Sequence, residues 1–227
     1  MRHIVRVVVF GVGTMLAGCA VAPLGFYESA FGSTSRIGFS AGGDIGRRYD
    51  YIPDDTAGIL ESDCYSNPLA LLGIDFSPIP PLTLGVEAYG PLGAIGGDLK
   101  AKATMVGNQN MAMALIAKAG ANSAEGDSWG THYSYNTQHL LVGGIASVGS
   151  PQMSVGFGPK LAFAHANISG GNSWYGNVVD YGGFVNGVLN LGLLGLAGEF
   201  SLLSVDRPEA DKRALMPYGG ARMSFRF

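Results

Sequence analysis

The sequence predicts an all-β chain that closes into an antiparallel, up-and-down transmembrane β-barrel of about ten strands, with eight or twelve strands as the alternatives. Three observations predict it. From residue 35 onward, apolar side chains alternate with small or polar ones, as on strands with two unlike faces. Short and long connections alternate between the apolar stretches. Only 14% of the 227 residues are charged, against about 25–35% on the surface of a soluble domain.

Composition excludes several other classes of protein. A hydrophobic content of 47% is too high for a disordered chain. The 36 glycines make long helices unfavourable, whereas a curved sheet tolerates them where strands bend. The net charge is −3 and the lysines and arginines are scattered, so no basic surface for nucleic acid is expected.

The predicted strands are separated by connections of two kinds. Tight turns rich in Gly, Pro and Asn are expected at 77–81, 107–110, 149–152 and 192–195, and longer polar loops at 47–67, 91–97, 121–134, 168–177 and 206–214. Short periplasmic turns that alternate with long outer loops are typical of outer-membrane barrels, and an even number of strands places both termini on the periplasmic side. The ten strands are expected at 35–46, 68–77, 82–90, 98–106, 111–120, 135–148, 153–167, 178–191, 196–205 and 215–227.

The two faces of each strand differ in polarity. In 82–90, for example, Leu84 and Val86 share one face, and Thr83 and Glu87 the other. Alternation alone does not say which face is inside. The scarcity of charge, the acidic residues in the loops and the aromatic residues near strand ends favour an apolar face turned outward to lipid.

The lumen would then contain a network of charges. A barrel of this size is narrow, so opposite charges are expected to pair into a plug, the alternative being a narrow conduit that favours anions. The residues assigned to this network are Asp75, Glu87, Lys100, Lys102, Lys118, Lys160, Glu199, Arg222 and Arg226.

The amino terminus carries an export signal. Residues 1–18 have a basic start and a short apolar stretch, as in a signal peptide. Leu16-Ala17-Gly18-Cys19 resembles the lipobox of bacterial lipoproteins, which implies diacylglycerol (with palmitate-type chains) on the Cys19 thiol, cleavage before Cys19 and acylation of its amino group. Residues 19–34 are then expected to be a lipidated tether on the periplasmic side, and 35–227 the barrel. The alternative is an ordinary signal peptide cleaved after Ala20 or Ala22.

The carboxyl terminus ends with Phe225 and Phe227 at alternate positions. This ending is similar to the signal that barrel-assembly machinery recognises on outer-membrane proteins of Gram-negative bacteria. The resemblance implies that this machinery is a partner during biogenesis. Outer-membrane lipid and lipopolysaccharide are the expected surroundings of the barrel.

No motif assigns a reaction. No catalytic residue, metal site or cofactor is predicted, and Cys64 has no assigned role. The chain is expected to be a structural or interaction component of the outer membrane whose long loops bind a partner or ligand, with Trp129, Trp174 and Tyr175 as candidate contacts. The alternatives are a narrow channel, an omptin-like or lipid-modifying hydrolase that uses residues such as Asp127 and His132, and a soluble lipocalin-like lipoprotein.

Overall fold

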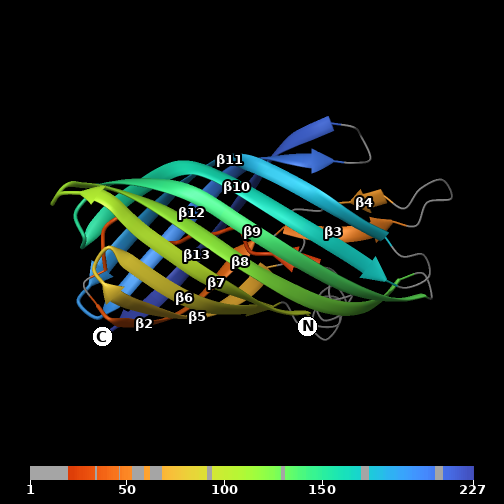
Figure 1. The fold of residues 1–227 in the computed structure, drawn as a ribbon, viewed down its shortest axis with the longest axis horizontal. Helices are drawn as coiled ribbons and strands as arrows, with labels where there is room; N and C mark the ends of the chain where they lie inside the picture. Colours follow the sequence, from red (N-terminus) through yellow and green to blue (C-terminus); the bar gives the residue numbers. More distant parts are fainter. Residues whose placement is uncertain are drawn as a thin grey trace, which may run out of the picture.

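Ten antiparallel strands close into a barrel in the computed structural model (Figure 1). The structure describes residues 20–33, 35–45, 47–52, 59–61, 68–90, 94–128, 131–169, 174–207 and 212–227. In that part of the chain, no helix is long and apolar enough to cross a membrane. The barrel strands, in their order around the barrel, are β2 (Ile37–Ile45), β5 (Pro68–Ile79), β6 (Leu82–Gly90), β7 (Ala94–Gly107), β8 (Met111–Ser128), β9 (Thr131–Gly149), β10 (Met153–Ser169), β11 (Trp174–Leu191), β12 (Leu194–Arg207) and β13 (Lys212–Arg226).

The predicted closed antiparallel barrel of ten strands is confirmed, because each of the ten expected stretches overlaps one barrel strand. The barrel closes where the first and last of these strands pair, from Asp44 opposite Gly220 to Gly38 opposite Arg226. The short turns lie together at one end. Gly149 and Gly192 adopt positive φ values there, 128° and 64°, which glycine accepts without steric cost.

The prediction of long loops was wrong in part. Most of the range 121–134 is strand, because β8 and β9 continue as a paired hairpin as far as Ser128 opposite Thr131. The ranges 91–97, 168–177 and 206–214 also contain strand residues. The β8–β9 extension beyond Gly120 has mostly small or polar residues on both faces, so it lacks the apolar alternation by which strands were recognised in the sequence.

A small second sheet lies at the end of the barrel opposite the short turns (Figure 1). It consists of β1 (Ala20–Ala22), β3 (Arg47–Ile52) and β4 (Ile59–Glu61) in the order β1-β3-β4. Strand β3 begins two residues after Ile45, the last residue of β2. Ala22 of β1 pairs with Arg47 of β3. We call this the long-hairpin end of the barrel, and the other the short-turn end.

Apolar side chains cover the outside of the barrel. Leu72 and Leu99 are 64% and 67% exposed, whereas Glu87 and Lys118 are each 1% exposed and face inward. This is the reverse of a soluble barrel, so the predicted orientation of the two faces is confirmed. Other large apolar side chains on the outer face are Ile74, Phe76, Val86, Met113, Leu115, Val155, Phe157, Val185, Phe200, Leu202 and Phe225.

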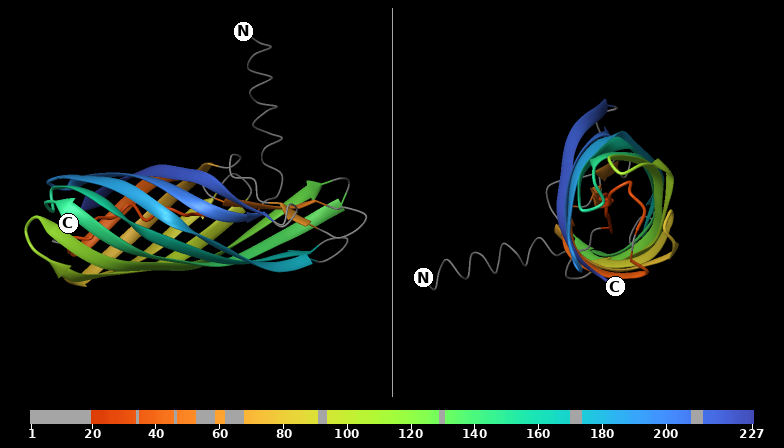
Figure 2. Two further views of the ribbon diagram at one scale, coloured as in Figure 1. Left: turned by 90° about the horizontal axis from the view of Figure 1, so that it is seen from above. Right: turned by 90° about the vertical axis from the view of Figure 1, so that its left-hand side faces the viewer.

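Residues 23–33, here called the lumen segment, run through the interior of the barrel (Figure 2, right). Phe26 and Ala30 are fully buried. The expectation that 19–34 forms a tether beneath the barrel is therefore wrong for the described residues of that range. The physical reason is that Leu24, Phe26, Tyr27 and Phe31 would expose a large apolar area in water, and the lumen removes it.

Candidate functional site

The candidate site is the lumen together with the segment that fills it. One part of the lumen wall is apolar, and the lumen segment packs its own apolar side chains there. The ring of Phe26 meets that of Phe184 edge-on, with centroids 5.6 Å apart. The buried cluster joins Leu24, Phe26, Ala30 and Phe31 of the segment to wall residues Ala112, Ala114, Ile116, Leu141, Ile145, Ala162, Phe184, Leu203, Val205, Met216 and Tyr218.

Glu87 is the centre of the charged part of the wall. Its carboxylate lies 2.7 Å from Lys118 Nζ and 3.5 Å from Lys100 Nζ, and it accepts a hydrogen bond from Arg222. Each of these side chains is at most 5% exposed. A carboxylate so far from water retains its charge only when cations surround it in this way.

The lumen segment contributes its own charge to this network. Glu28 pairs with Lys100 and lies 3.2 Å from Lys102 Nζ. Lys100 also reaches Asp75, at 2.7 Å. The segment is therefore both an apolar filler and the counter-charge for two lysines of β7.

Buried carboxylates of the wall bind the backbone N–H groups of the segment. Leu24 and Gly25 donate to Asp44, at 3.1 and 2.8 Å. The N–H groups of Phe26 and Tyr27 donate to Glu199, at 3.0 and 3.3 Å. Such charge-assisted bonds replace the partners that a regular element would provide.

Wall side chains also donate to the carbonyl groups of the segment. Every residue from 24 to 31 has at least one backbone group hydrogen-bonded to a side chain of the wall. A buried backbone without regular structure is stable only where other groups of the protein satisfy its N–H and C=O groups, as here. The donors are Lys160 to Leu24 (2.6 Å), Lys118 to Gly25 (2.6 Å), Asn186 to Glu28 (2.7 Å), Lys102 to Ser29 (3.0 Å) and Phe31 (3.2 Å), and Thr104 to Ala30 (2.8 Å), while Ser147 accepts from the Ala30 N–H (2.9 Å).

The nine charged residues assigned to the lumen from the sequence all face inward. Seven are buried, while Asp75 and Arg226 are partly exposed near the short-turn end. Ion pairs link seven of the nine to one another: Lys100 to Asp75 and Glu87, Lys118 and Arg222 to Glu87, and Lys160 to Glu199.

Four carboxylates of the lumen were missed from the sequence. Glu28, Asp44, Asp98 and Asp180 are all buried. Asp98 lies 2.8 Å from Nε2 of His139 on the neighbouring part of the wall. With these four carboxylates, the lumen no longer has more cations than carboxylates. The alternative of a conduit that favours anions depended on that excess.

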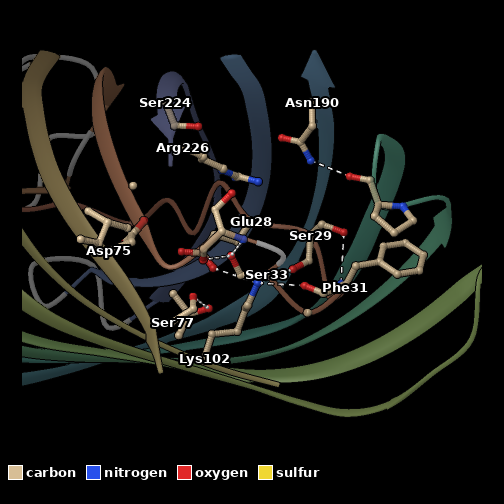
Figure 3. A pocket seen from close by; sticks show the side chains of 16 residues that line it. Glu28, Ser29, Phe31, Ser33, Asp75, Ser77, Lys102, Asn190, Ser224 and Arg226 are labelled. Carbon is tan, nitrogen blue, oxygen red and sulfur yellow. Dashed lines mark hydrogen bonds and ion pairs between the residues drawn. The ribbon is translucent and has the colours of Figure 1, made fainter. Parts of the chain in front are cut away.

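A polar cavity of about 60 Å³ remains at the short-turn end of the lumen (Figure 3). Glu28, Asp75, Lys102, Asn190 and Arg226 are among the residues that line it. Asn190 is held by a hydrogen bond from its Nδ2 to the Pro151 carbonyl, at 2.6 Å. This volume holds only a few water molecules. The cavity next to the lumen segment is therefore too small for a large ligand.

The remaining candidates lie away from the lumen or outside the described residues. Cys19, Cys64 and Trp129 are outside them. Trp174 and Tyr175 begin β11, opposite Ile168 and Asn167. Phe225 is exposed on the outer face of β13, and the ring of Phe227 packs edge-on against that of Phe39, at 6.4 Å.

The pair considered for hydrolysis lies on the extended hairpin. Asp127 and His132 are register partners near its tip. Within the described ranges, no group of three or more His, Cys, Asp or Glu side chains is arranged to hold a metal ion.

The fold and the site together define a ten-stranded β-barrel with an apolar exterior and a lumen occupied by its own chain. No family model and no curated protein matches the sequence. Solved structures of similar shape include the outer membrane protease OmpT from Escherichia coli (TM-score 0.47, 9% identity, 93% of this chain and 96% of that one). Others are the translocator domain of the autotransporter NalP from Neisseria meningitidis (0.46, 10%, 86% and 90%) and CdiB from Acinetobacter baumannii (0.41, 11%, 94% and 41%). These likenesses concern the barrel alone.

Proposed function

We propose that this protein is an outer-membrane β-barrel closed by its own lumen segment, and that it acts as a structural or interaction component of the membrane rather than as an open channel. The apolar exterior supports the membrane location. Side chains such as Leu72, Leu99 and Phe157 would lie in water if the barrel were soluble, and exposed apolar surface on that scale normally meets lipid or protein. The same observation argues against a lipocalin-like soluble barrel.

The seating of the lumen segment is the observation that carries the closed state. Its backbone is bonded to the wall at each residue from 24 to 31, and its apolar side chains fill the other part of the lumen. Displacing it would break its charge-assisted hydrogen bonds to Asp44 and Glu199 and return the buried rings of Phe26 and Phe31 to water. Exposure of each such ring costs about 1.5–3 kcal/mol, which favours the closed state.

Interaction is then assigned to the long-hairpin end. The extended hairpins, the sheet of β1, β3 and β4, and the candidate contacts Trp174 and Tyr175 belong to this end. The third candidate contact, Trp129, lies outside the described residues. By analogy with outer-membrane barrels, this end faces outward, toward lipopolysaccharide and any protein partner, and the short turns face the periplasm. The ending Phe225 to Phe227 supports recognition by the barrel-assembly machinery, and the lipobox supports lipidation of Cys19.

Conductance in planar lipid bilayers tests the closed state. The wild-type protein is expected to give no stable current steps. A variant in which residues 23–33 are replaced by a Gly/Ser stretch of equal length should give discrete steps, because the wall then faces water. Heat-modifiable migration on gels establishes that both proteins are folded barrels. Steps of equal size in the wild type and the variant would contradict the proposal.

A separate measurement tests the membrane location. The protein should sediment with outer membranes and require detergent for extraction. If a Cys19→Ala variant stays soluble as a monomer in buffer without detergent, the proposal of a membrane barrel is contradicted.

A further inference from the structure

The direction in which the lumen segment crosses the barrel determines where the amino terminus emerges. At the short-turn end, the Ser33 N–H donates to the Pro80 carbonyl in the turn between β5 and β6, at 3.0 Å. At the long-hairpin end, Ala20–Ala22 pair with β3, which follows the far end of β2. The two ends of the segment are therefore fixed at opposite mouths of the barrel (Figure 2).

The contacts between these ends follow one another without reversal. Leu24 and Gly25 bind Asp44, near the far end of β2, and the next two residues bind Glu199 on β12. Ala30 binds Thr104 near the short-turn end of β7. The segment therefore passes once through the barrel.

The length of the segment matches a membrane crossing. Eleven extended residues reach at most about 36–40 Å, and the apolar band of an outer-membrane barrel is about 25 Å high. Tyr27 has a φ of 55°, which turns the chain and shortens its reach. Enough length remains for residue 22 to leave the band on the side opposite residue 33.

From this geometry we propose that the lumen segment carries the amino-terminal end of the processed chain through the barrel to the outer face of the membrane, so that acyl chains on Cys19 enter the outer leaflet. The inference rests on the proposed membrane barrel and on the lipidation predicted at Cys19, which precedes Ala20 directly. It differs from the expected lipidated tether on the periplasmic side, because the described residues next to Cys19 lie at the long-hairpin end.

Cysteine labelling on intact cells tests the direction. In a Cys64→Ser background, Val21→Cys and Ala22→Cys are compared; their side chains point to opposite sides of β1, so one of them is accessible whichever face is covered. Glu125→Cys, on the exposed part of the β8–β9 hairpin, is the control for the outer face. Gln109→Cys, in the short turn between β7 and β8, is the control for the periplasmic face.

A membrane-impermeant maleimide should label at least one of the β1 variants on intact cells, to the extent seen for Glu125→Cys, while Gln109→Cys reacts only after permeabilisation. Labelling of both β1 variants only after permeabilisation, with Glu125→Cys reactive on intact cells, would overturn the inference and leave the membrane barrel standing. If Glu125→Cys is also unreactive on intact cells, the proposed membrane orientation fails and the inference fails with it.

The lipid is tested separately. Incorporation of labelled palmitate should be lost in a Cys19→Ala variant. Equal incorporation by this variant, or none by the wild type, would overturn the assignment of the acyl chains to Cys19 without affecting the labelling result.

Discussion

Replacing Glu87 by glutamine is expected to destabilise the barrel more than any comparable change on its surface. Glutamine keeps the shape of the side chain and removes its charge. Lys118 and Arg222 would then lie buried without the carboxylate that each of them contacts, whereas Lys100 keeps Glu28 and Asp75. Removing one partner of a buried ion pair costs about 3–5 kcal/mol.

The lower half of that range already changes the folding equilibrium by about two orders of magnitude. The free energy of unfolding is measured by urea titration of the protein refolded into lipid vesicles. Heat-modifiable migration on gels reports the folded fraction at each urea concentration. Glu125→Gln is the matched control, since that carboxylate is exposed and its loss is expected to change stability by less than about 0.5 kcal/mol.

A double variant separates charge from packing. Adding Lys118→Met to Glu87→Gln removes one of the uncompensated charges, and replacing a buried pair by apolar groups is often neutral. The double variant should therefore recover a large part of the loss. A loss below about 1 kcal/mol in Glu87→Gln alone would refute the view that the network depends on this carboxylate.

Three further substitutions test the lumen segment, the wall and the exterior. Phe26→Ala should lower stability by about 3–5 kcal/mol in the same titration, because its ring is fully buried; an unchanged midpoint would mean that the segment is not seated. Gly120→Val should reduce the folded fraction, since a Cβ there would lie 2.0 Å from Asp98 Oδ1, while Gly187→Ala, with open space around it, should fold normally; similar yields from both would contradict the packing of the wall. Leu72→Arg should lower the yield of folding into vesicles, with a cost of up to about 2–4 kcal/mol near the middle of the bilayer; a wild-type yield would show that this face does not contact lipid.

The positions of the strands could be predicted because each has two chemically different faces. In β6, Leu84 and Val86 are exposed to the outside while Thr83 and Glu87 are buried, as the alternation of the sequence indicated. The same pattern located the lumen charges on β7. Where both faces are polar, as in the hairpin beyond Gly120, periodicity carries no information and the strands were underestimated.

The lumen segment could not be predicted from periodicity, because it has no regular structure. Its conformation depends on side chains such as Asp44 and Glu199, which lie far from it in the sequence. Two signals in the sequence indicated it. Phe26 and Phe31 are apolar side chains that are poorly suited to a tether in water. The residues assigned to the lumen also had more cations than carboxylates, and Glu28 supplies one of the missing carboxylates.

The pairing of β2 with β13 closes the barrel around the lumen segment, which directly precedes β2 in the chain. Sliding it into a finished barrel would strip water from every amide before its wall partner is reached, whereas laying strands around it forms these bonds one by one. Closure of the strands around the segment is therefore a more favourable route to this structure than insertion of the segment into a closed barrel.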